Sequence, residues 1–402
     1  MNLRTFCTLL GTATFVISTA ANAAVHRVYP GESIQAAIDG ASPGDTILVE
    51  PGTYQEVGNG RYGLRITTDN LRLIGKVKKG QGEAGKVRVL QNEVQETGVY
   101  AAPSGCDYDV QDDTPEGQEC RSRSLQGFYI RGFSVEEFPK NGIQTRWVDG
   151  FEFVRNASVN NLNNGIYPTL SANGLVRNNE SYGSLDTAMW VAGSENVRVI
   201  GNELHSSVIG FEITVSNNVE VKQNEIYGNT VGVGLFHPNG AGNPPLPVMA
   251  NWVIEHNDIY DNNLSPNPAP PGSFQADLPP GAGVLLLGVS DHVVAKNNIE
   301  DNDYVGIGVL GWCTALAGGP RDCGDGSGLR WPPQANNNLI AQNYLSGNGG
   351  SPPPGAPLPA VDLLYVQFEP GAGGNCFMKN KPKNGFTYFS SEPDGELPTD
   401  GC

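Results

Sequence analysis

The sequence has few charged residues, and fewer basic than acidic ones. Only 17% of the 402 residues are charged, and 25 Lys and Arg stand against 42 Asp and Glu, for a formal net charge of −17. A chain this acidic repels polyanions, which disfavours nucleic acid and anionic membranes as partners. We therefore expect no nucleic acid among its ligands.

Several familiar sequence signatures are also missing. After the first 23 residues, no segment approaches the roughly 20 consecutive apolar residues that a transmembrane helix needs. The chain contains neither a His-x-x-x-His nor a Cys-x-x-Cys pair, which disfavours a metal-hydrolase helix and a zinc site. We therefore assign no metal ligand from these motifs, and the cofactor remains unknown.

The N-terminus predicts export. Residues 1–23 combine Arg4, an apolar stretch and a small-residue Ala21-Asn22-Ala23 cleavage site, as a secretory signal does. The expected location is therefore secreted or periplasmic, where cysteines pair. Six cysteines remain after cleavage, and the simplest of their fifteen pairings joins neighbours: Cys106 with Cys120, Cys313 with Cys323, and Cys376 with Cys402.

The main feature of the sequence is a repeat of about 22 residues that recurs along the chain. A unit this short cannot bury its own apolar face, so the pattern predicts a solenoid of stacked coils, each with about three strands. An asparagine at a corner tolerates a positive φ, and stacked amides can form a hydrogen-bonded ladder. The asparagines that share the repeat register are Asn156, Asn179, Asn202, Asn224, Asn257, Asn297 and Asn343.

A second strand in each coil follows about eight residues after the asparagine. Because alternate residues of a strand point to opposite faces, it yields one inward and one outward column. The inward column is Ile166, Met189, Phe211, Val233, Val284 and Ile307. The outward column is Gln144, Tyr167, Trp190, Glu212, Gly234, Leu285 and Gly308.

The start of the mature chain carries a family resemblance. Ser33-Ile34-Gln35-Ala36-Ala37-Ile38, followed by Pro43-Gly44-Asp45-Thr46-Ile47 and Pro51-Gly52-Thr53-Tyr54, resembles the opening coil of pectin-lyase-like proteins. The closest likeness is to bacterial parallel β-helix domain proteins of unassigned activity. This resemblance implies an all-β, right-handed parallel β-helix of about ten coils over residues 24–366. A short helix would cap its N-terminal end, and residues 367–402 would form a C-terminal capping tail.

The resemblance does not identify which activity the protein has. The superfamily includes polysaccharide lyases, glycoside hydrolases and uronate epimerases, and a shared fold does not fix a reaction. This chain lacks both the clustered calcium-binding aspartates with an arginine base of the lyases and the Asp-Pro-His-Asp motif of alginate epimerases. A polysaccharide or other glycan is therefore the expected partner, without a specified reaction or oligomeric state.

Insertions interrupt the repeat at residues 91–124, 237–250, 264–281 and 311–334. The second and fourth follow the same strand of their coils, so we expect them to leave the same corner of the solenoid. Loops gathered along one edge of a sheet form a wall, and the groove beside it suits an extended ligand.

The outward column supplies the candidate site. Tyr167 and Trp190 could stack on sugar rings, Gln144 could contact the ligand, and Glu212 could bind hydroxyl groups or move a proton. The alternative is that the two aromatic residues only stabilise neighbouring strands and that Glu212 is solvated. Glycine at the next position, Gly234, would leave room for the ligand.

Three further residues are candidate catalytic groups. Asp186 could pair with Glu212 for hydrolysis or for binding calcium, although a turn aspartate is usually only a turn former. Arg146 could bind a carboxylated sugar, or be an ordinary surface arginine. His237 stands where a strand meets the first wall loop.

Two functional classes remain open. In the first, the protein is a lyase, hydrolase or epimerase that acts on polysaccharide. In the second, it is a non-catalytic periplasmic or cell-surface protein that binds glycan or provides a rigid support.

Overall fold

The structure is a computed structural model that describes residues 23–57, 60–77, 86–92, 94–237, 249–315, 329, 331–382, 387–399 and 402. The expected signal at 1–23 lies outside these residues except for its last position. Most of the two wall insertions, 237–250 and 311–334, also lies outside them.

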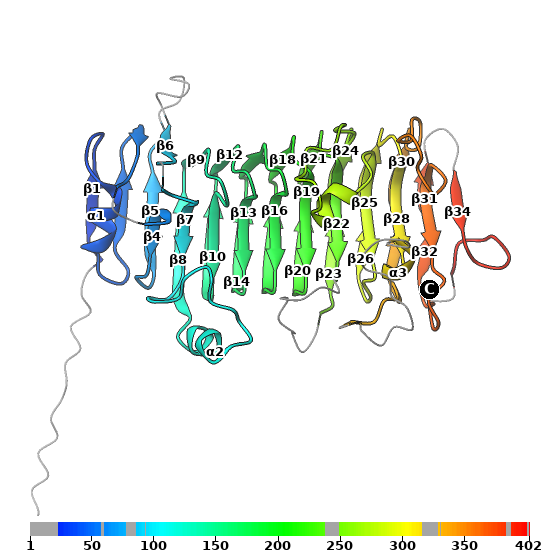
Figure 1. Ribbon diagram of the computed structural model, residues 1–402, viewed down its shortest axis with the longest axis horizontal. Helices are drawn as coiled ribbons and strands as arrows, with labels where there is room; N and C mark the ends of the chain where they lie inside the picture. The colour runs from blue at the N-terminus through cyan, green and yellow to red at the C-terminus, as the bar shows by residue number, and fades with distance from the viewer. Residues whose placement is uncertain are drawn as a thin grey trace, which may run out of the picture.

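Three parallel sheets form the body of the molecule, and each coil contributes one strand to each sheet (Figure 1). Sheet A contains β1 (Val25–Val28), β2 (Thr46–Val49), β5 (Leu71–Gly75), β8 (Leu125–Arg131), β11 (Val148–Val154), β14 (Ala172–Arg177), β17 (Glu195–Ile200), β20 (Asn217–Lys222), β23 (Trp252–Glu255), β26 (Val293–Ala295), β29 (Leu339–Ala341) and β32 (Cys376–Met378). Sheet B contains β3 (Gly52–Tyr54), β6 (Val87–Leu90), β9 (Phe133–Glu136), β12 (Ala157–Val159), β15 (Glu180–Tyr182), β18 (Glu203–His205), β21 (Glu225–Tyr227), β24 (Asp258–Tyr260), β27 (Asn298–Glu300), β30 (Tyr344–Ser346) and β33 (Lys381–Pro382). Sheet C contains β4 (Tyr62–Ile66), β7 (Thr97–Ala101), β10 (Ile143–Arg146), β13 (Asn164–Thr169), β16 (Thr187–Ala192), β19 (Ile209–Thr214), β22 (Val231–Phe236), β25 (Ala282–Leu287), β28 (Val305–Leu310), β31 (Val361–Val366) and β34 (Tyr388–Ser390). The predicted parallel β-helix is confirmed.

The few helices lie at the end or in the insertions. They are α1 (Ile34–Asp39), α2 (Pro115–Ser122), α3 (Trp312–Ala315) and the 3-10 helix η2 (Phe274–Asp277). As predicted, Ser33 caps α1 by accepting a hydrogen bond from the Ala36 N–H at 3.0 Å, and the helix buries Ile34 and Ile38. None of the described helices is long and apolar enough to cross a membrane.

The asparagine ladder is confirmed, but its geometry differs from the prediction. The Asn202 side chain donates to Asn224 Oδ1 at 2.9 Å and to the Val176 carbonyl at 3.0 Å, and its neighbours in the register repeat this pattern. The positive φ belongs to the preceding residue, for example 55° at Asn178 and 56° at Gln223. The assignment of the positive φ to the ladder asparagine is therefore wrong, because that residue turns its amide into the stack while its predecessor makes the corner.

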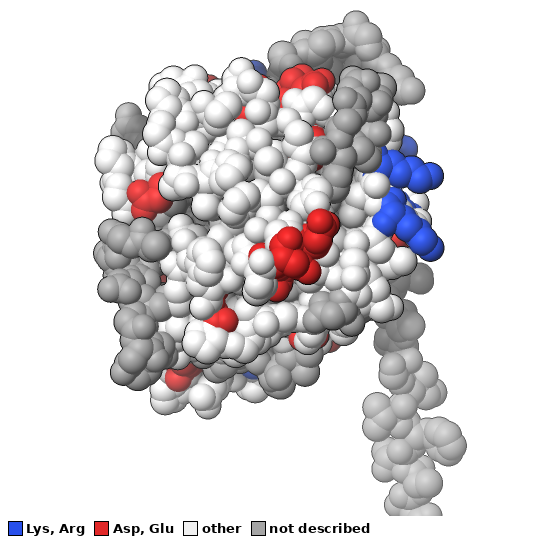
Figure 2. Space-filling model, turned by 90° about the vertical axis from the view of Figure 1, so that its right-hand side faces the viewer, with Lys and Arg blue, Asp and Glu red and all other residues white. Residues whose placement is uncertain are grey.

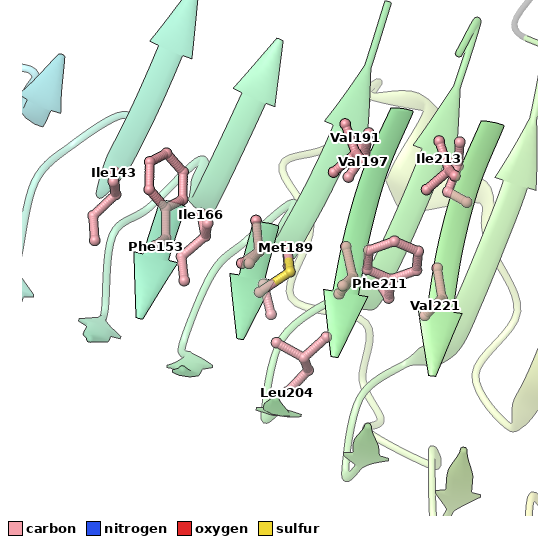
Figure 3. Packing of buried hydrophobic residues seen from close by; sticks show 14 of the residues in the cluster. Ile143, Phe153, Ile166, Met189, Val191, Val197, Leu204, Phe211, Ile213 and Val221 are labelled. Carbon is pink, nitrogen blue, oxygen red and sulfur yellow. The ribbon is translucent and has the colours of Figure 1, made fainter. Parts of the chain in front are cut away.

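The inward column forms the centre of the core, as predicted. Ile166, Met189 and Phe211 are fully buried, and they stack along the axis from neighbouring strands (Figure 3). The strand register pairs Ile166 with Met189 and Met189 with Phe211. A shift of one residue would have placed these side chains outside, so the inward and outward assignment is confirmed.

The C-terminal segment differs from the expected tail without a repeat. Strands β32, β33 and β34 extend sheets A, B and C, and Asn380 accepts a hydrogen bond from the Asn343 side chain at 3.0 Å. This segment therefore forms a further coil. Seen from that end, most of the molecule carries uncharged side chains, with acidic groups near the middle and basic groups at one edge (Figure 2).

Two of the three predicted disulfides are confirmed, Cys106–Cys120 and Cys376–Cys402. Cys313 is also disulfide-bonded. Its predicted partner, Cys323, lies outside the described residues.

Candidate functional site

The candidate site occupies the outer face of sheet C between β10 and β19. The register pairs Gln144 with Tyr167 and Trp190 with Glu212, so these four residues follow one another along a single column. The structure thus brings together the outward residues that the alternation of the strands predicted. Their surroundings decide what each one can do.

The two aromatic rings stand on edge rather than flat. Tyr167 and Trp190 stack on each other with ring centroids 4.6 Å apart and planes 12° from parallel. Trp190 also donates its Nε1 hydrogen to Thr214 Oγ1 at 3.0 Å. Each ring therefore uses one face for its neighbour, as in the strand-stabilising alternative, and the pair does not present a flat platform for sugars.

A threonine joins the two candidate carboxyl groups. Thr187 Oγ1 lies 3.1 Å from Asp186 Oδ1 and 2.8 Å from Glu212 Oε2. A hydroxyl group has a single proton, so it can donate to one carboxyl group and must accept from the other. Two separate two-centre hydrogen bonds therefore form when one of the two carboxyl groups is protonated.

Burial determines which carboxyl group holds the proton. Glu212 is only 3% exposed, and burial together with the charge of Asp186 raises the pKa of Glu212 well above its usual value. Burial raises the pKa of Asp186 to about 6, against hydrogen bonds from Thr187 and Gln275 that lower it. The proton of the pair therefore resides on Glu212 in preference to Asp186, which ionises first.

The segment 264–281 covers this pair. Gln275, in η2, makes a side-chain hydrogen bond to Asp186. The glutamine therefore links the insertion to the carboxyl pair. Asp186 is partly exposed and Glu212 is not.

A small pocket of 220 Å³ lies beside the aromatic pair. Its lining includes Gln144, Arg146 and Tyr167 from sheet C and residues of the Cys106–Cys120 loop. Arg146 is buried, and its guanidinium group donates to the backbone carbonyls of Tyr108 and Val110. The arginine therefore anchors the disulfide loop over the pocket.

Beyond β19 the same face of sheet C is closed. A Cβ atom at Gly234 would lie 2.4 Å from the Phe236 ring, so that ring fills the space expected for a ligand. Phe236 also packs edge-on against Phe274 of the insertion at 5.2 Å. The prediction that glycine leaves an open groove here is wrong, because a neighbouring aromatic side chain occupies the space.

His237 belongs to a different cluster. Its ring packs edge-on against Trp252 at 5.1 Å and lies 6.2 Å from the His292 ring. Burial lowers the pKa of His237 to about 4. The described contacts therefore place this histidine in a packed corner of the solenoid and give it no link to Asp186 or Glu212.

Sequence reasoning missed two sets of polar residues. Thr187 and Gln275 were not singled out, although Thr187 follows Asp186 directly. On sheet B, Glu180, Glu203 and His205 offer donor atoms that all lie within 4.8 Å of one another. A glutamate follows the ladder asparagine in successive coils, and this recurrence was the signal for the second set.

A match to one protein family covers part of the chain. The family model described as "Periplasmic copper-binding protein (NosD)" matches residues 108–270, about two fifths of the sequence. No curated protein matches the sequence.

Solved structures resemble most of the chain at low identity. The Dettilon tailspike protein (gp208) has a TM-score of 0.52 and 15% identity over 92% of this chain, which spans only 61% of the tailspike. DFA-IIIase from Arthrobacter chlorophenolicus A6, without its lid and in complex with GF2, has a TM-score of 0.54 and 14% identity over 89% of this chain and 85% of its own. The A-module of the Azotobacter vinelandii mannuronan C-5 epimerase AlgE4 has a TM-score of 0.49 and 15% identity over 91% and 93%.

The likenesses to the tailspike protein and to DFA-IIIase agree with the three parallel sheets and show the fold. The chain is a right-handed parallel β-helix protein. For this parallel β-helix protein, the reaction must be argued from the site itself.

Proposed function

We propose that this protein is exported, binds carbohydrate and hydrolyses a glycosidic bond with Glu212 and Asp186. The observation that carries the proposal is the Thr187 hydroxyl between the two carboxyl groups. This arrangement suits one protonated and one ionised partner, which are the two forms that acid–base hydrolysis of glycosides uses.

The roles follow from the protonation states. Glu212 holds a proton at neutral pH and donates it to the leaving oxygen, while ionised Asp186 attacks the anomeric carbon. Because both carboxyl oxygens lie within 3.1 Å of one hydroxyl oxygen, they are at most about 6 Å apart. This spacing favours the covalent, retaining route, in which water then releases the sugar from Asp186.

Access to the pair requires a movement of the insertion. Glu212 is buried, and Gln275 contacts Asp186 from above. Substrate therefore reaches the acid when η2 moves away from sheet C. Trp190 then forms the neighbouring wall of the site, because it stands next to Glu212 in the column.

A second candidate function is non-catalytic glycan binding. The 220 Å³ pocket supports it, since Gln144 and Tyr167 line this pocket without the cover that lies over the carboxyl pair. The pocket is smaller than those that hold drug-sized ligands, so it suits a single sugar unit. In this case Asp186 and Glu212 would serve only to attach the insertion.

A screen on pectate, alginate and neutral glycans, with and without calcium, separates the two functions. We expect new reducing ends from the wild-type protein, and loss of them in Glu212→Gln and Asp186→Asn. Glu152→Gln, an exposed glutamate on sheet A, serves as the matched control and should retain activity. Unsaturated products would contradict hydrolysis, and binding without any product would favour the second function.

The matched family is described as copper-binding, so copper is a candidate ligand of this chain. Soft Cu(I) prefers thiolate and thioether ligands, whereas two cysteine pairs form disulfides and Met189 is buried in the core. The partly exposed Met249 and Met378 lie on coils that are separated by two others. Within residues 108–270, the converging donors of the described chain are the two carboxylates and the imidazole on sheet B. This set suits a divalent ion rather than Cu(I).

A further inference from the structure

We propose that Glu180, Glu203 and His205 bind one divalent ion of the first transition row on the outer face of sheet B. One oxygen from each carboxylate and one ring nitrogen all lie within 4.8 Å of one another. Two carboxylates and an imidazole are a common ligand set for Zn²⁺ and related ions, and they leave a coordination position open. The site is independent of the carboxyl pair on sheet C.

The repeat brings these residues together. In the register of sheet B, Glu180 pairs with Glu203 and Tyr182 pairs with His205. Residues two apart in a strand share a face, so all four side chains point outward. Neighbouring strands lie about 4.8 Å apart, which places the two carboxylates and the imidazole side by side.

The imidazole is held in a fixed orientation. His205 lies between the rings of Tyr182 and Tyr227, with centroids at 4.7 and 5.0 Å and planes 14° and 9° from parallel. Its Nδ1 lies 3.0 Å from Ser206 Oγ, so Nε2 is the nitrogen that faces Glu180, 3.6 Å from Oε1. Contacts of this kind orient a metal ligand and fix its tautomer.

The second carboxylate is also positioned. Tyr227 donates its hydroxyl hydrogen to Glu203 Oε1 at 2.6 Å, and Oε2 remains for an ion.

Charge favours a cation at this place. Glu180 and Glu203 are direct neighbours, and Glu225 follows in the same column. Like charges on neighbouring strands repel each other, and a divalent ion would cancel the charge of the first two.

Glu180 and Glu203 also line an 810 Å³ groove together with Lys76, Arg131 and Arg155. The open coordination position could therefore face an anionic group bound in that groove.

The test is Zn²⁺ binding by isothermal titration calorimetry to tag-free protein pretreated with a chelator. We expect one ion per chain. Glu203→Gln and His205→Phe should each weaken binding by about 100-fold, and Tyr227→Phe by about tenfold, the range found when partners of metal ligands are removed. His205→Phe keeps an aromatic ring between the two tyrosines, so the stack that supports the strand is preserved.

Glu225→Gln is the matched control, because this glutamate occupies the next position in the column but accepts from Tyr260 instead. Its Zn²⁺ affinity should equal that of the wild type. With Cu²⁺ as a spectroscopic probe, electron paramagnetic resonance should show coupling to one imidazole nitrogen, and His205→Phe should abolish it. Unchanged Zn²⁺ binding in both Glu203→Gln and His205→Phe would overturn the proposal, as would binding of Ca²⁺ but not Zn²⁺. Glycan turnover is not a readout here, so the result does not depend on the proposed hydrolysis.

Discussion

The outer face of sheet C has two halves that share a backbone and differ in what covers them. From β10 to β19 the column carries Gln144, Tyr167, Trp190 and Glu212, beside a pocket and a carboxyl pair. From β22 to β31 an apolar cluster built around Phe236, Leu285, Leu310 and Trp312 fills the face. An outward position in a solenoid is therefore not the same as an exposed one.

The insertion 264–281 makes apolar contacts with one half of this face and a polar contact with the other. In the apolar half, the insertion packs through Phe274 against the ring of Phe236. In the polar half, the same insertion touches the sheet through Gln275 and Asp186. Two consecutive residues of η2 thus make an apolar contact and a polar contact with sheet C, and the reactive groups lie at the polar contact.

The largest expected loss of stability comes from a substitution in the apolar half. Phe236→Ala should lower the free energy of unfolding by about 3–5 kcal/mol, because it removes a buried ring that fills the space over Gly234. Thr214 pairs with Phe236 in the register, and Thr214→Ala should cost only about 1 kcal/mol, the value of a hydrogen bond. Urea denaturation measures both variants. Equal losses would show that the two halves are packed alike.

The next largest losses of stability are expected from two substitutions in one strand of the polar half, one on its inward side and one on its outward side. Met189→Ala should cost about 2–5 kcal/mol, since it leaves a cavity in the core. Trp190→Ala should cost less, about 1–2 kcal/mol, for the stacked pair with Tyr167 and the hydrogen bond to Thr214. The same denaturation experiment decides the order. A larger loss for Trp190→Ala would reverse the assignment of inside and outside.

Much of this architecture could be predicted from the sequence, and the cover over the site could not. The repeat positions of Asn179, Asn202 and Asn224 predicted the ladder, and the alternation around Met189 and Trp190 predicted the two faces. Local periodicity does not show where an insertion packs. The cover over the carboxyl pair depends on a contact between Asp186 and Gln275, which are about 90 positions apart in the sequence.

A further expected effect is the pH dependence of stability. The folded pKa values of Asp186 and Glu212 are raised, so the folded protein binds more protons than the unfolded chain once the pH exceeds about 4. Stability contributed by the pair is fully present below that pH and is lost as the pH rises through the folded pKa values. The slope cannot exceed about 1.4 kcal/mol per pH unit for each group.

The variant Glu212→Gln isolates the contribution of Glu212 to this pH dependence, because glutamine can still form a hydrogen bond with Thr187 but does not titrate. Unfolding measured from pH 4 to 9 should show a flatter profile for this variant than for the wild type. The control Glu152→Gln should keep the wild-type profile. Parallel profiles for wild type and Glu212→Gln would contradict a raised pKa at Glu212.

The most direct test of a protonated and an ionised carboxyl group side by side is the carboxyl ¹³C NMR signal of Glu212. Glu212→Gln assigns the signal by its disappearance, and Asp186→Asn shows how far the neighbouring charge shifts the titration. The account predicts that Glu212 is still protonated at pH 7, while Asp186 ionises near pH 6. A Glu212 signal that titrates near the usual glutamate pKa of about 4.3 would contradict it.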